Sequence, residues 1–262
     1  MKVAVHGATG RMGLVVSRLA HEAPDMQIVG AVCASVDPHQ GKDIGELAGV
    51  GTLGVIASTD LGAGLLGADV VIDFSHASAV PELVAEAARQ KLPVVSGTTG
   101  LDPAGMRALE KASGAVAVLW APNMSVGIQV LAELVEHAVR QLGDQYDVEI
   151  TEVHHRKKKD APSGTARRLF EAAQSVRSHL APTHSRQGDI GERRAEEVGV
   201  FALRGGDVVG EHTVHLFGPG EWLELTHRAT SRELFGHGAL RAARFVVGRK
   251  PGLYSIKDVL TR

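Results

Sequence analysis

The sequence is short of several residue classes, and each shortage excludes a class of function. It contains one cysteine, Cys33, so neither an internal disulfide nor a multi-cysteine zinc or iron–sulfur site can form. Aromatic residues make up 4%, which is too few for the stacked platforms that bind single-stranded nucleic acid. The formal net charge of −2 provides no global basic field that would attract nucleic acid or an anionic membrane.

Long hydrophobic runs are also missing. No segment approaches the length of about 18 apolar residues that a membrane span needs, and the opening MKVAVHG lacks the apolar stretch of a signal peptide. Hydrophobic residues nevertheless make up 44% of the 262 residues, which is enough for a substantial core. We therefore expect a globular cytoplasmic protein that binds neither nucleic acid nor membranes.

In the first half of the chain, short apolar runs alternate with helical patterns, which is typical of βαβ units around a parallel sheet. The first unit consists of a strand over 2–6, a glycine-spaced turn over 7–13 and a helix over 12–22. The segment 49–67 contains six glycines, so we expect mostly loop there, with at most one short strand and helix. Further strands are predicted over 27–33, 69–74, 93–96 and 115–120, with helices over 78–91 and after an Asp102 N-cap followed by Pro103.

The pattern changes after residue 120, where Ser125 can cap a long amphipathic helix. Its apolar stripe is placed on Val126, Val130, Leu134, Ala138 and Leu142. We then expect a strand over 147–153, a helix over 163–179 and an exposed loop over 183–197. After the loop, we expect strands over 198–203, 208–216 and 222–227 and a helix over 233–247. The three late strands predict an antiparallel or mixed sheet, and the last helix could return to the first domain.

The sequence GATGRMG places Gly7, Gly10 and Gly13 between the first strand and the first helix. Such a turn lets the backbone approach a pyrophosphate, whose charge the helix N-terminus stabilises. The spacing is G-x-x-G-x-x-G and differs from the usual G-x-G-x-x-G. The alternative is a glycine turn that serves only the tight packing of the strand on the helix.

The choice between NADH and NADPH depends on the end of the second strand. There, about 20 positions beyond the glycines, an acidic residue would bind the ribose diol of NADH. The positions 33–35 contain no carboxylate, whereas Arg11, Ser35 and Lys42 could bind a 2′-phosphate. We therefore expect NADPH to be accepted at least as well as NADH, and the alternative is that Asp37 reaches the ribose from the loop.

Two further segments follow predicted strands, SGTTG over 96–100 and APNMS over 121–125. Ligands of an open parallel sheet bind beyond the carboxyl ends of its strands, so the small and hydroxylated residues here suit a nicotinamide and its ribose. The same residue types also populate ordinary turns.

The segment EITEVHHRKKKDAPSGTA over 149–166 is the most informative of the chain. His154 and His155 would lie on opposite faces of a strand, so a shared ligand requires the strand to end or twist there. Four basic residues follow, and Ser163-Gly164-Thr165 opens a helix whose N–H groups can bind a carboxylate. This combination predicts a site for a small anion, and the alternative is a solvated basic loop beside a helix cap.

Metal binding and hydrolysis are weaker interpretations of the same residues. His212 and His215 could join the histidine pair, but neighbouring histidines in strands diverge and no nearby cysteine completes a zinc site. No G-x-S-x-G nucleophile elbow is present. We therefore expect no metal and no Ser–His–Asp chemistry.

The motifs GATGRMG, GTTG, APNMSVG, EVHHRKKKDAPSGTA and VGEHTV, and the ending GLYSIKDVL, resemble those of the dihydrodipicolinate reductase family. The resemblance implies an α/β fold with a Rossmann-type nucleotide-binding domain over 1–125 and 235–262. An α+β domain with a mixed sheet over 126–234 would bind the substrate and form the contacts of a homotetramer. The implied reaction is the NADPH- or NADH-dependent reduction of 4-hydroxy-tetrahydrodipicolinate, a small dicarboxylate of lysine and diaminopimelate synthesis, to tetrahydrodipicolinate.

The resemblance also implies roles for individual residues. His154 and Lys158 match the catalytic pair, and His155, Ser163, Gly164 and Thr165 match contacts to the substrate carboxylates. The cofactor contacts would be Gly7, Ala8, Thr9, Gly10, Arg11, Met12, Ser35, Gly97, Thr98, Thr99, Ala121, Pro122, Asn123 and Met124. Two departures are the missing carboxylate after the second strand and Met124 in place of an aromatic residue.

Two rival functions are a Rossmann reductase of another small dicarboxylate and a nucleotide sensor that has lost turnover. Hydride transfer to a ring conjugated to an imine requires a nearby acid to supply a proton. His154 and Lys158 can supply it, which favours an enzyme over a sensor.

Overall fold

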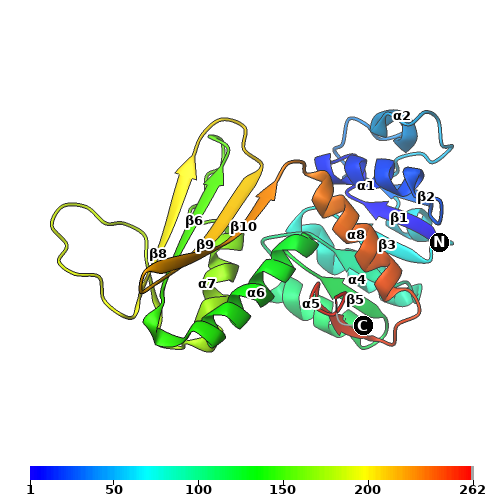
Figure 1. Ribbon diagram of the computed structural model, residues 1–262. Coiled ribbons are helices and arrows are strands. Elements are labelled where there is room, and N and C mark those ends of the chain that lie inside the picture. Colours follow the sequence, from blue (N-terminus) through cyan, green and yellow to red (C-terminus); the bar gives the residue numbers. More distant parts are fainter. Residues whose placement is uncertain (261–262) are drawn as a thin grey trace. The chain divides into compact units, whose positions relative to one another are not determined.

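The computed structural model describes residues 1–260, and the chain divides into two compact units (Figure 1). Unit one contains Met1–Met124 and the chain from Glu233 onward, and unit two contains Ser125–Arg232. Unit two is therefore inserted between two parts of unit one. Within residues 1–260, no helix has both the length and the apolar character that crossing a membrane requires.

Unit one is built on a parallel sheet of six strands in the order β11-β5-β4-β3-β1-β2. The strands are β1 (Lys2–His6), β2 (Gln27–Val32), β3 (Val70–Asp73), β4 (Val94–Ser96), β5 (Ala117–Trp120) and β11 (Gly252–Tyr254). Parallel strands are covered on both faces, and accordingly Val3, Ala4 and Val5 are fully buried. Because β1 lies between β2 and β3, the chain changes direction there, which creates a crevice at the carboxyl ends of these strands.

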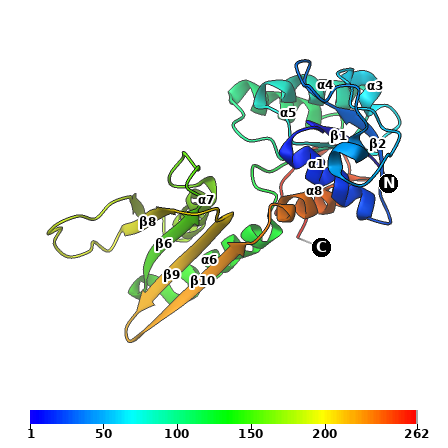
Figure 2. The ribbon, with the colours of Figure 1, turned by 90° about the horizontal axis from the view of Figure 1, so that it is seen from above.

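Helices cover both faces of this sheet, as Figure 2 shows: α4 and α5 pack together on one side, and α1 and α8 pack together on the other. The helices are α1 (Arg11–Glu22), α2 (Ile44–Ala48), α3 (Leu61–Leu65), α4 (Val80–Arg89), α5 (Pro103–Ser113) and α8 (Glu233–Val246). Asp102 caps α5 by accepting a 2.7 Å hydrogen bond from the Gly105 N–H, and Pro103 opens the helix. The predicted cap and the predicted α/β fold are confirmed.

A buried carboxylate organises the glycine-rich segment after β2. Asp43 accepts backbone hydrogen bonds from Gly45 and Glu46 in α2, and from residues 53, 54 and 55 of the following loop. The short helix expected in this segment is α3, while the short strand is reduced to isolated bridges such as Asp43 to Ile56. The sequence pattern predicted neither α2 nor β11, because both are too short to show a periodicity.

Unit two contains a mixed sheet in the order β10-β9-β6-β8-β7. The strands are β6 (Asp147–His154), β7 (Ala181–Thr183), β8 (Glu197–Arg204), β9 (Gly210–Gly218) and β10 (Glu221–Ala229), with helices α6 (Val126–Leu142) and α7 (Gly164–Val176). β9 is antiparallel to both β6 and β10, whereas β6, β8 and β7 are parallel to one another. The predicted mixed sheet is confirmed.

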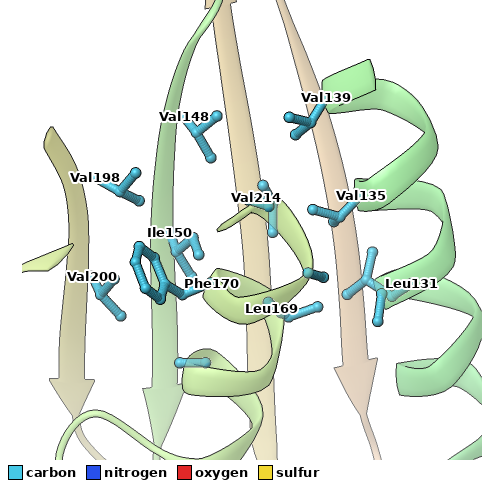
Figure 3. Close-up of a cluster of buried hydrophobic side chains, with 14 of the residues drawn as sticks. Leu131, Val135, Val139, Val148, Ile150, Leu169, Phe170, Val198, Val200 and Val214 are labelled. Atoms are coloured by element: carbon cyan, nitrogen blue, oxygen red, sulfur yellow. The ribbon is translucent and has the colours of Figure 1, made fainter. Parts of the chain in front are cut away.

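Both helices of unit two pack on the same face of its sheet. Figure 3 shows the apolar core between the two helices and the sheet. Leu131, Val135 and Val139 of α6 lie in this core, one position after the predicted stripe. The predicted stripe is therefore wrong at Val130 and Leu134, which are 41% and 48% exposed, whereas its members Ala138 and Leu142 do pack against this core. The helix has two neighbouring apolar stripes, and periodicity alone cannot tell which of them faces the sheet. The opposite face of the sheet exposes large apolar side chains.

Candidate active site

The turn between β1 and α1 is held by close backbone contacts. Gly7 has a φ of +72°, and a Cβ there would lie 2.7 Å from the carbonyl oxygen of Phe74. A Cβ on Gly13 would lie 2.2 Å from the carbonyl oxygen of Gly7. Packing thus explains these two glycines. The N-cap of α1 is Gly10, which provides no side-chain hydrogen bond, so the positive end of the helix is left available to an anion.

A cavity of about 410 Å³ opens beside this turn. Of the predicted cofactor residues, it is lined by Arg11, Met12, Gly97, Thr98, Thr99, Pro122 and Met124. The lining also includes Phe74, Ser75 and Phe235, which the sequence did not predict. The first two directly follow β3, as expected for a ligand site at the carboxyl end of a parallel strand. Phe235 belongs to α8, and no local signal connects it with the glycine turn.

The other predicted cofactor residues are not among those that line the cavity. Gly7, Ala8, Thr9 and Gly10 form the turn, and the Ala8 N–H donates a 2.9 Å hydrogen bond to the Val32 carbonyl. Ala121 is buried, and its N–H bonds the carbonyl of Ser96 at 3.0 Å. Asn123 is half-buried beside it, whereas Ser35 is exposed beyond β2. Ala8 and Ala121 thus contribute to the backbone frame of the site.

Asp37 folds back onto the glycine turn. Its Oδ2 accepts a 2.5 Å hydrogen bond from the Thr9 hydroxyl, and its Oδ1 accepts a 2.8 Å bond from the His39 N–H. These two bonds, the one from Thr9 first, lower the pKa of Asp37, so the side chain is a carboxylate at neutral pH. The turn therefore has an acidic neighbour that comes from the loop and not from the strand end.

Behind the cavity, the buried carboxylate of Asp73 connects three strand ends. It bonds His6 Nδ1 at 2.8 Å and accepts hydrogen bonds from the hydroxyls of Ser96 at 2.6 Å and Thr98 at 2.8 Å. The Ser75 N–H adds a fourth bond at 3.1 Å. Burial would raise the pKa of Asp73, but the bonds with His6, Ser75 and Ser96 outweigh it and lower that pKa. The Thr98 hydroxyl, predicted to contact the cofactor, thus holds its own loop in place.

In unit two, β6 ends at His154, as a ligand shared by His154 and His155 requires. His154 Nδ1 is bonded to the carboxylate of Glu152, which is 0% exposed. The same carboxylate accepts two bonds from Arg204, at 2.8 and 2.9 Å, and one from the Ser163 N–H at 2.9 Å. Burial would raise the pKa of Glu152, but the bonds from His154, Arg204 and Ser163 lower it to about 2.

A second buried histidine lies against the first. The rings of His154 and His212 meet edge to face with centroids 5.0 Å apart, and His212 Nε2 lies 3.0 Å from the Ser163 hydroxyl. Burial, followed by the field of His154, lowers the pKa of His212 to about 3, so this ring is neutral at neutral pH. Ser163 Oγ also accepts a bond from the Ala166 N–H, and its own N–H donates to Glu152, the partner of His154. Ser163, a predicted substrate contact, therefore supports both histidines.

The basic segment after β6 forms a turn that positions Lys158. Its N–H donates to the His155 carbonyl at 3.0 Å, and its ammonium donates to both oxygens of Asp160 at 2.9 Å. The bond from Lys158 lowers the pKa of Asp160. His155 is half-buried, and its Nδ1 has no hydrogen-bond partner among residues 1–260. Gly164 and Thr165 form the first turn of α7, where N–H groups can bind a carboxylate.

Several residues of this cluster were missed by sequence analysis. Glu152 precedes His154 by two positions and so shares its face of the strand, a signal that the sequence did contain. Arg204 and Asp160 gave no such signal, since their roles depend on strand pairing and on the shape of the turn. His212 was weighed only as a metal ligand, and residues 1–260 contain no group of His, Cys, Asp and Glu that could bind a metal ion.

Models of one protein family match both units of the chain. Residues 1–124 match the family model for dihydrodipicolinate reductase, N-terminus, and residues 127–260 match that for dihydrodipicolinate reductase, C-terminus. The 4-hydroxy-tetrahydrodipicolinate reductase of Anaeromyxobacter sp. (strain Fw109-5) is 48% identical over 263 residues, covering 99% of this chain and 97% of that protein. The protein of that name from Syntrophus aciditrophicus (strain SB) is 46% identical, with coverages of 99% and 98%.

Solved structures share the fold. The dipicolinate-bound dihydrodipicolinate reductase from Paenisporosarcina sp. TG-14 superposes with a TM-score of 0.79 at 21% identity, covering 99% of both chains. An amine dehydrogenase from Mycobacterium smegmatis gives a TM-score of 0.63 at 14% identity, covering 98% of this chain and 95% of that one. With relatives near half identity along its full length and family models over both of its units, the chain belongs to the dihydrodipicolinate reductase family.

Proposed function

We propose that this protein is an NAD(P)H-dependent oxidoreductase that reduces 4-hydroxy-tetrahydrodipicolinate to tetrahydrodipicolinate. The observation that carries the proposal is the cluster at the end of β6. There a histidine bonded to a buried carboxylate is followed by a turn that positions Lys158 and by the first turn of α7. The relatives with this name supply the substrate, and the rest follows from the chemistry of the residues.

The residues of unit one fit a dinucleotide. Gly7 and Gly10 allow the backbone to approach a pyrophosphate, and the first turn of α1 offers N–H groups and a positive dipole end. The cavity beside this turn has the size of a small-molecule site. When bound there, the dinucleotide supplies the hydride.

Both NADH and NADPH are expected to be used. Asp37 can bind a ribose diol and would repel a 2′-phosphate, because its carboxylate lies at the glycine turn. Arg11 is exposed beside the same turn. Lys42 is also close: its Nζ lies 3.5 Å from His39 Nδ1, and the His39 N–H donates to Asp37. These two cations would bind the 2′-phosphate. The acidic and basic groups therefore oppose each other, which argues against strict selection of one cofactor.

In unit two, the proposed substrate contacts are cationic groups and backbone N–H groups. His155 and the first turn of α7, Gly164 and Thr165, bind one carboxylate, while Lys158 pairs with the other and exchanges Asp160 for it. Hydride addition leaves negative charge on the ring, and His154 donates the proton that neutralises it. Donation requires a proton on both ring nitrogens of His154, and because Glu152 accepts the Nδ1 proton, the proton that leaves comes from Nε2.

We also propose a cytoplasmic homotetramer. The sheet face of unit two that lies opposite α6 and α7 exposes Leu203 at 53%, Phe217 at 40% and Trp222 at 65%. The rings of Phe217 and Trp222 have centroids 6.4 Å apart, so they form one apolar patch. Exposed apolar strands invite pairing with another copy, and a symmetric assembly would bury them. Light scattering at micromolar concentration should give about four times the chain mass, and a monodisperse monomer would exclude the assembly.

A coupled assay tests the proposed reaction. The synthase that makes the substrate is mixed with its own two substrates, this protein and NADPH or NADH, and the loss of reduced nicotinamide is followed. We expect oxidation only when the synthase is present. Oxidation that is independent of the synthase would indicate another dicarboxylate reductase. Tight cofactor binding with no oxidation would indicate a sensor.

A further inference from the structure

Glu152 makes more contacts than an ion pair with Arg204 requires. One carboxylate oxygen accepts bonds from Arg204 Nη2 and the Ser163 N–H, and the other accepts bonds from Arg204 Nη1 and His154. These donors come from β8, from the cap of α7 and from β6 itself. Since each donor fixes one direction, the carboxylate has a single orientation, and its Oε2 presents a fixed acceptor to His154.

The opposite nitrogen of His154 lies beside Gly210, a position without a side chain. A Cβ added to Gly210 at the start of β9 would come within 3.0 Å of His154 Nε2. A side chain at this position would therefore press on the nitrogen, and glycine avoids this contact. Gly210 has no positive φ, so backbone conformation does not demand a glycine there.

We propose that Glu152 is the positioning residue for the proton donor of this enzyme. It keeps the Nδ1 proton of His154 directed into the protein and so presents Nε2 to the substrate. The inference rests on the proposed function, because it assigns Glu152 a role in the protonation step. Arg204 and Ser163 hold Glu152 in place, and Gly210 places no side chain against Nε2.

The charges around His154 support this arrangement. Glu152 and Arg204 neutralise each other, Lys158 is paired with Asp160, and His212 is neutral and adds no competing positive charge. In Glu152→Gln one oxygen becomes an NH2 group, which must face a donor: Arg204, Ser163 or His154. Either the histidine tautomer inverts or the anchor of Glu152 breaks.

The matched control is Glu149→Gln. Glu149 lies on the same strand, is 9% exposed and accepts bonds from Arg186 at 2.7 and 2.8 Å, with a further bond from Arg193 at 3.0 Å. Glu149→Gln therefore also removes a buried carboxylate of β6 that is bonded to arginine, but this carboxylate is not bonded to a histidine. A purely structural role for Glu152 would make both variants alike.

The test combines kinetics with NMR of the full-length protein labelled with ¹⁵N-histidine. We expect Glu152→Gln to lower kcat by about 10²-fold with KM within a few-fold, and to move the alkaline limb of the kcat profile to lower pH. Glu152→Asp should restore part of kcat, and Glu149→Gln should leave the limb in place. Equal behaviour of Glu152→Gln and Glu149→Gln would overturn the proposal.

The NMR arm does not depend on turnover. The His154 signals, identified by their loss in His154→Gln, should show a proton on Nδ1 in the unmodified protein and lose that pattern in Glu152→Gln. A proton on Nε2 alone in the unmodified protein would overturn the proposal, even if Glu152→Gln fails to fold. A protein that shows the Nδ1 proton but does not oxidise NAD(P)H in the coupled assay would refute the proposed function and leave this geometry intact.

Discussion

The Thr9 hydroxyl donates a 2.5 Å hydrogen bond to Asp37, and this bond brings a carboxylate from the loop after β2 against the glycine turn. The acidic group that the second strand lacks at its end is thus supplied a few residues later. We therefore expect the cofactor preference to depend on the balance between that carboxylate, which would bind a ribose diol, and the nearby cations, which would bind a 2′-phosphate.

Asp37→Ala is expected to favour NADPH. The substitution removes a group that can bind the ribose diol of NADH and that repels a 2′-phosphate. The ratio of kcat/KM for NADPH to that for NADH should rise by about tenfold, equivalent to about 1.4 kcal/mol. Thr9→Val, which keeps the carboxylate, should change the ratio less. An unchanged ratio in Asp37→Ala would show that Asp37 does not contact the ribose.

Asp73→Asn is expected to weaken cofactor binding. An amide cannot accept hydrogen bonds from His6, Ser75, Ser96 and Thr98 together, so the loop that lines the cavity loses its anchor. Fluorescence titration should give an NADH Kd about tenfold higher, equivalent to about 1.4 kcal/mol. Asp69→Asn, just before the other end of β3, is the control and should leave Kd unchanged. Equal Kd values in both variants would contradict the role of Asp73.

Asp160→Asn is expected to lower the KM for the substrate. Lys158 is paired with Asp160, so a substrate carboxylate must replace that partner. An exposed ion pair contributes about 0–1 kcal/mol, which sets the decrease in KM at up to about fivefold. Asp189→Asn, on the exposed loop before β8, serves as the control. A higher KM in Asp160→Asn would show that Asp160 holds Lys158 in its working position.

Acid should destabilise the protein partly through His212. Its folded-state pKa of about 3 lies below the ordinary 6.5, so below pH 6.5 the unfolded chain binds a proton that the native ring does not. The contribution to stability is therefore lost as pH falls from 6.5 toward 3, by about 1–2 kcal/mol between 6.5 and about 5. The contribution of the Glu152 carboxylate to stability is lost at lower pH, as the pH falls from 4.5 toward about 2.

Urea unfolding at a series of pH values measures this effect. His212→Gln should flatten the decrease of the unfolding free energy between about pH 6.5 and 5. The control His137→Gln removes an exposed histidine and should keep the slope of the unmodified protein. If His212→Gln retains the full slope, the buried ring is not the group that takes up the proton.

Elements with a local signal could be predicted from the sequence. Rules that span a few neighbouring residues account for three features: the glycines after β1, the Asp102 and Pro103 pair, and the end of β6 at His154. These rules were sufficient for the α/β class and for most of the lining of the cavity. The short-range motif around His154 and Lys158 likewise predicts the centre of the site in unit two, and that assignment stays a prediction.

Features that depend on tertiary contacts could not be predicted. The stripe on α6 was misplaced because burial of Leu131 rather than Val130 is decided by the sheet beneath the helix. Asp37 entered only as an alternative ribose contact, because the bend of its loop is set by bonds to Thr9 and His39. The pairing of Arg204 with Glu152 requires β8 to lie beside β6, which a single sequence does not reveal.

His154→Gln provides the most direct test of the central claim that His154 is the proton donor of a reductase. In the synthase-coupled assay, we predict a kcat at least about 10²-fold lower, with the substrate KM within a few-fold and the NADH Kd unchanged. The Kd should not change because His154 and the cofactor cavity belong to different units. A kcat equal to that of the unmodified protein would contradict the claim, as would a loss of NADH binding that accounts for the lower rate.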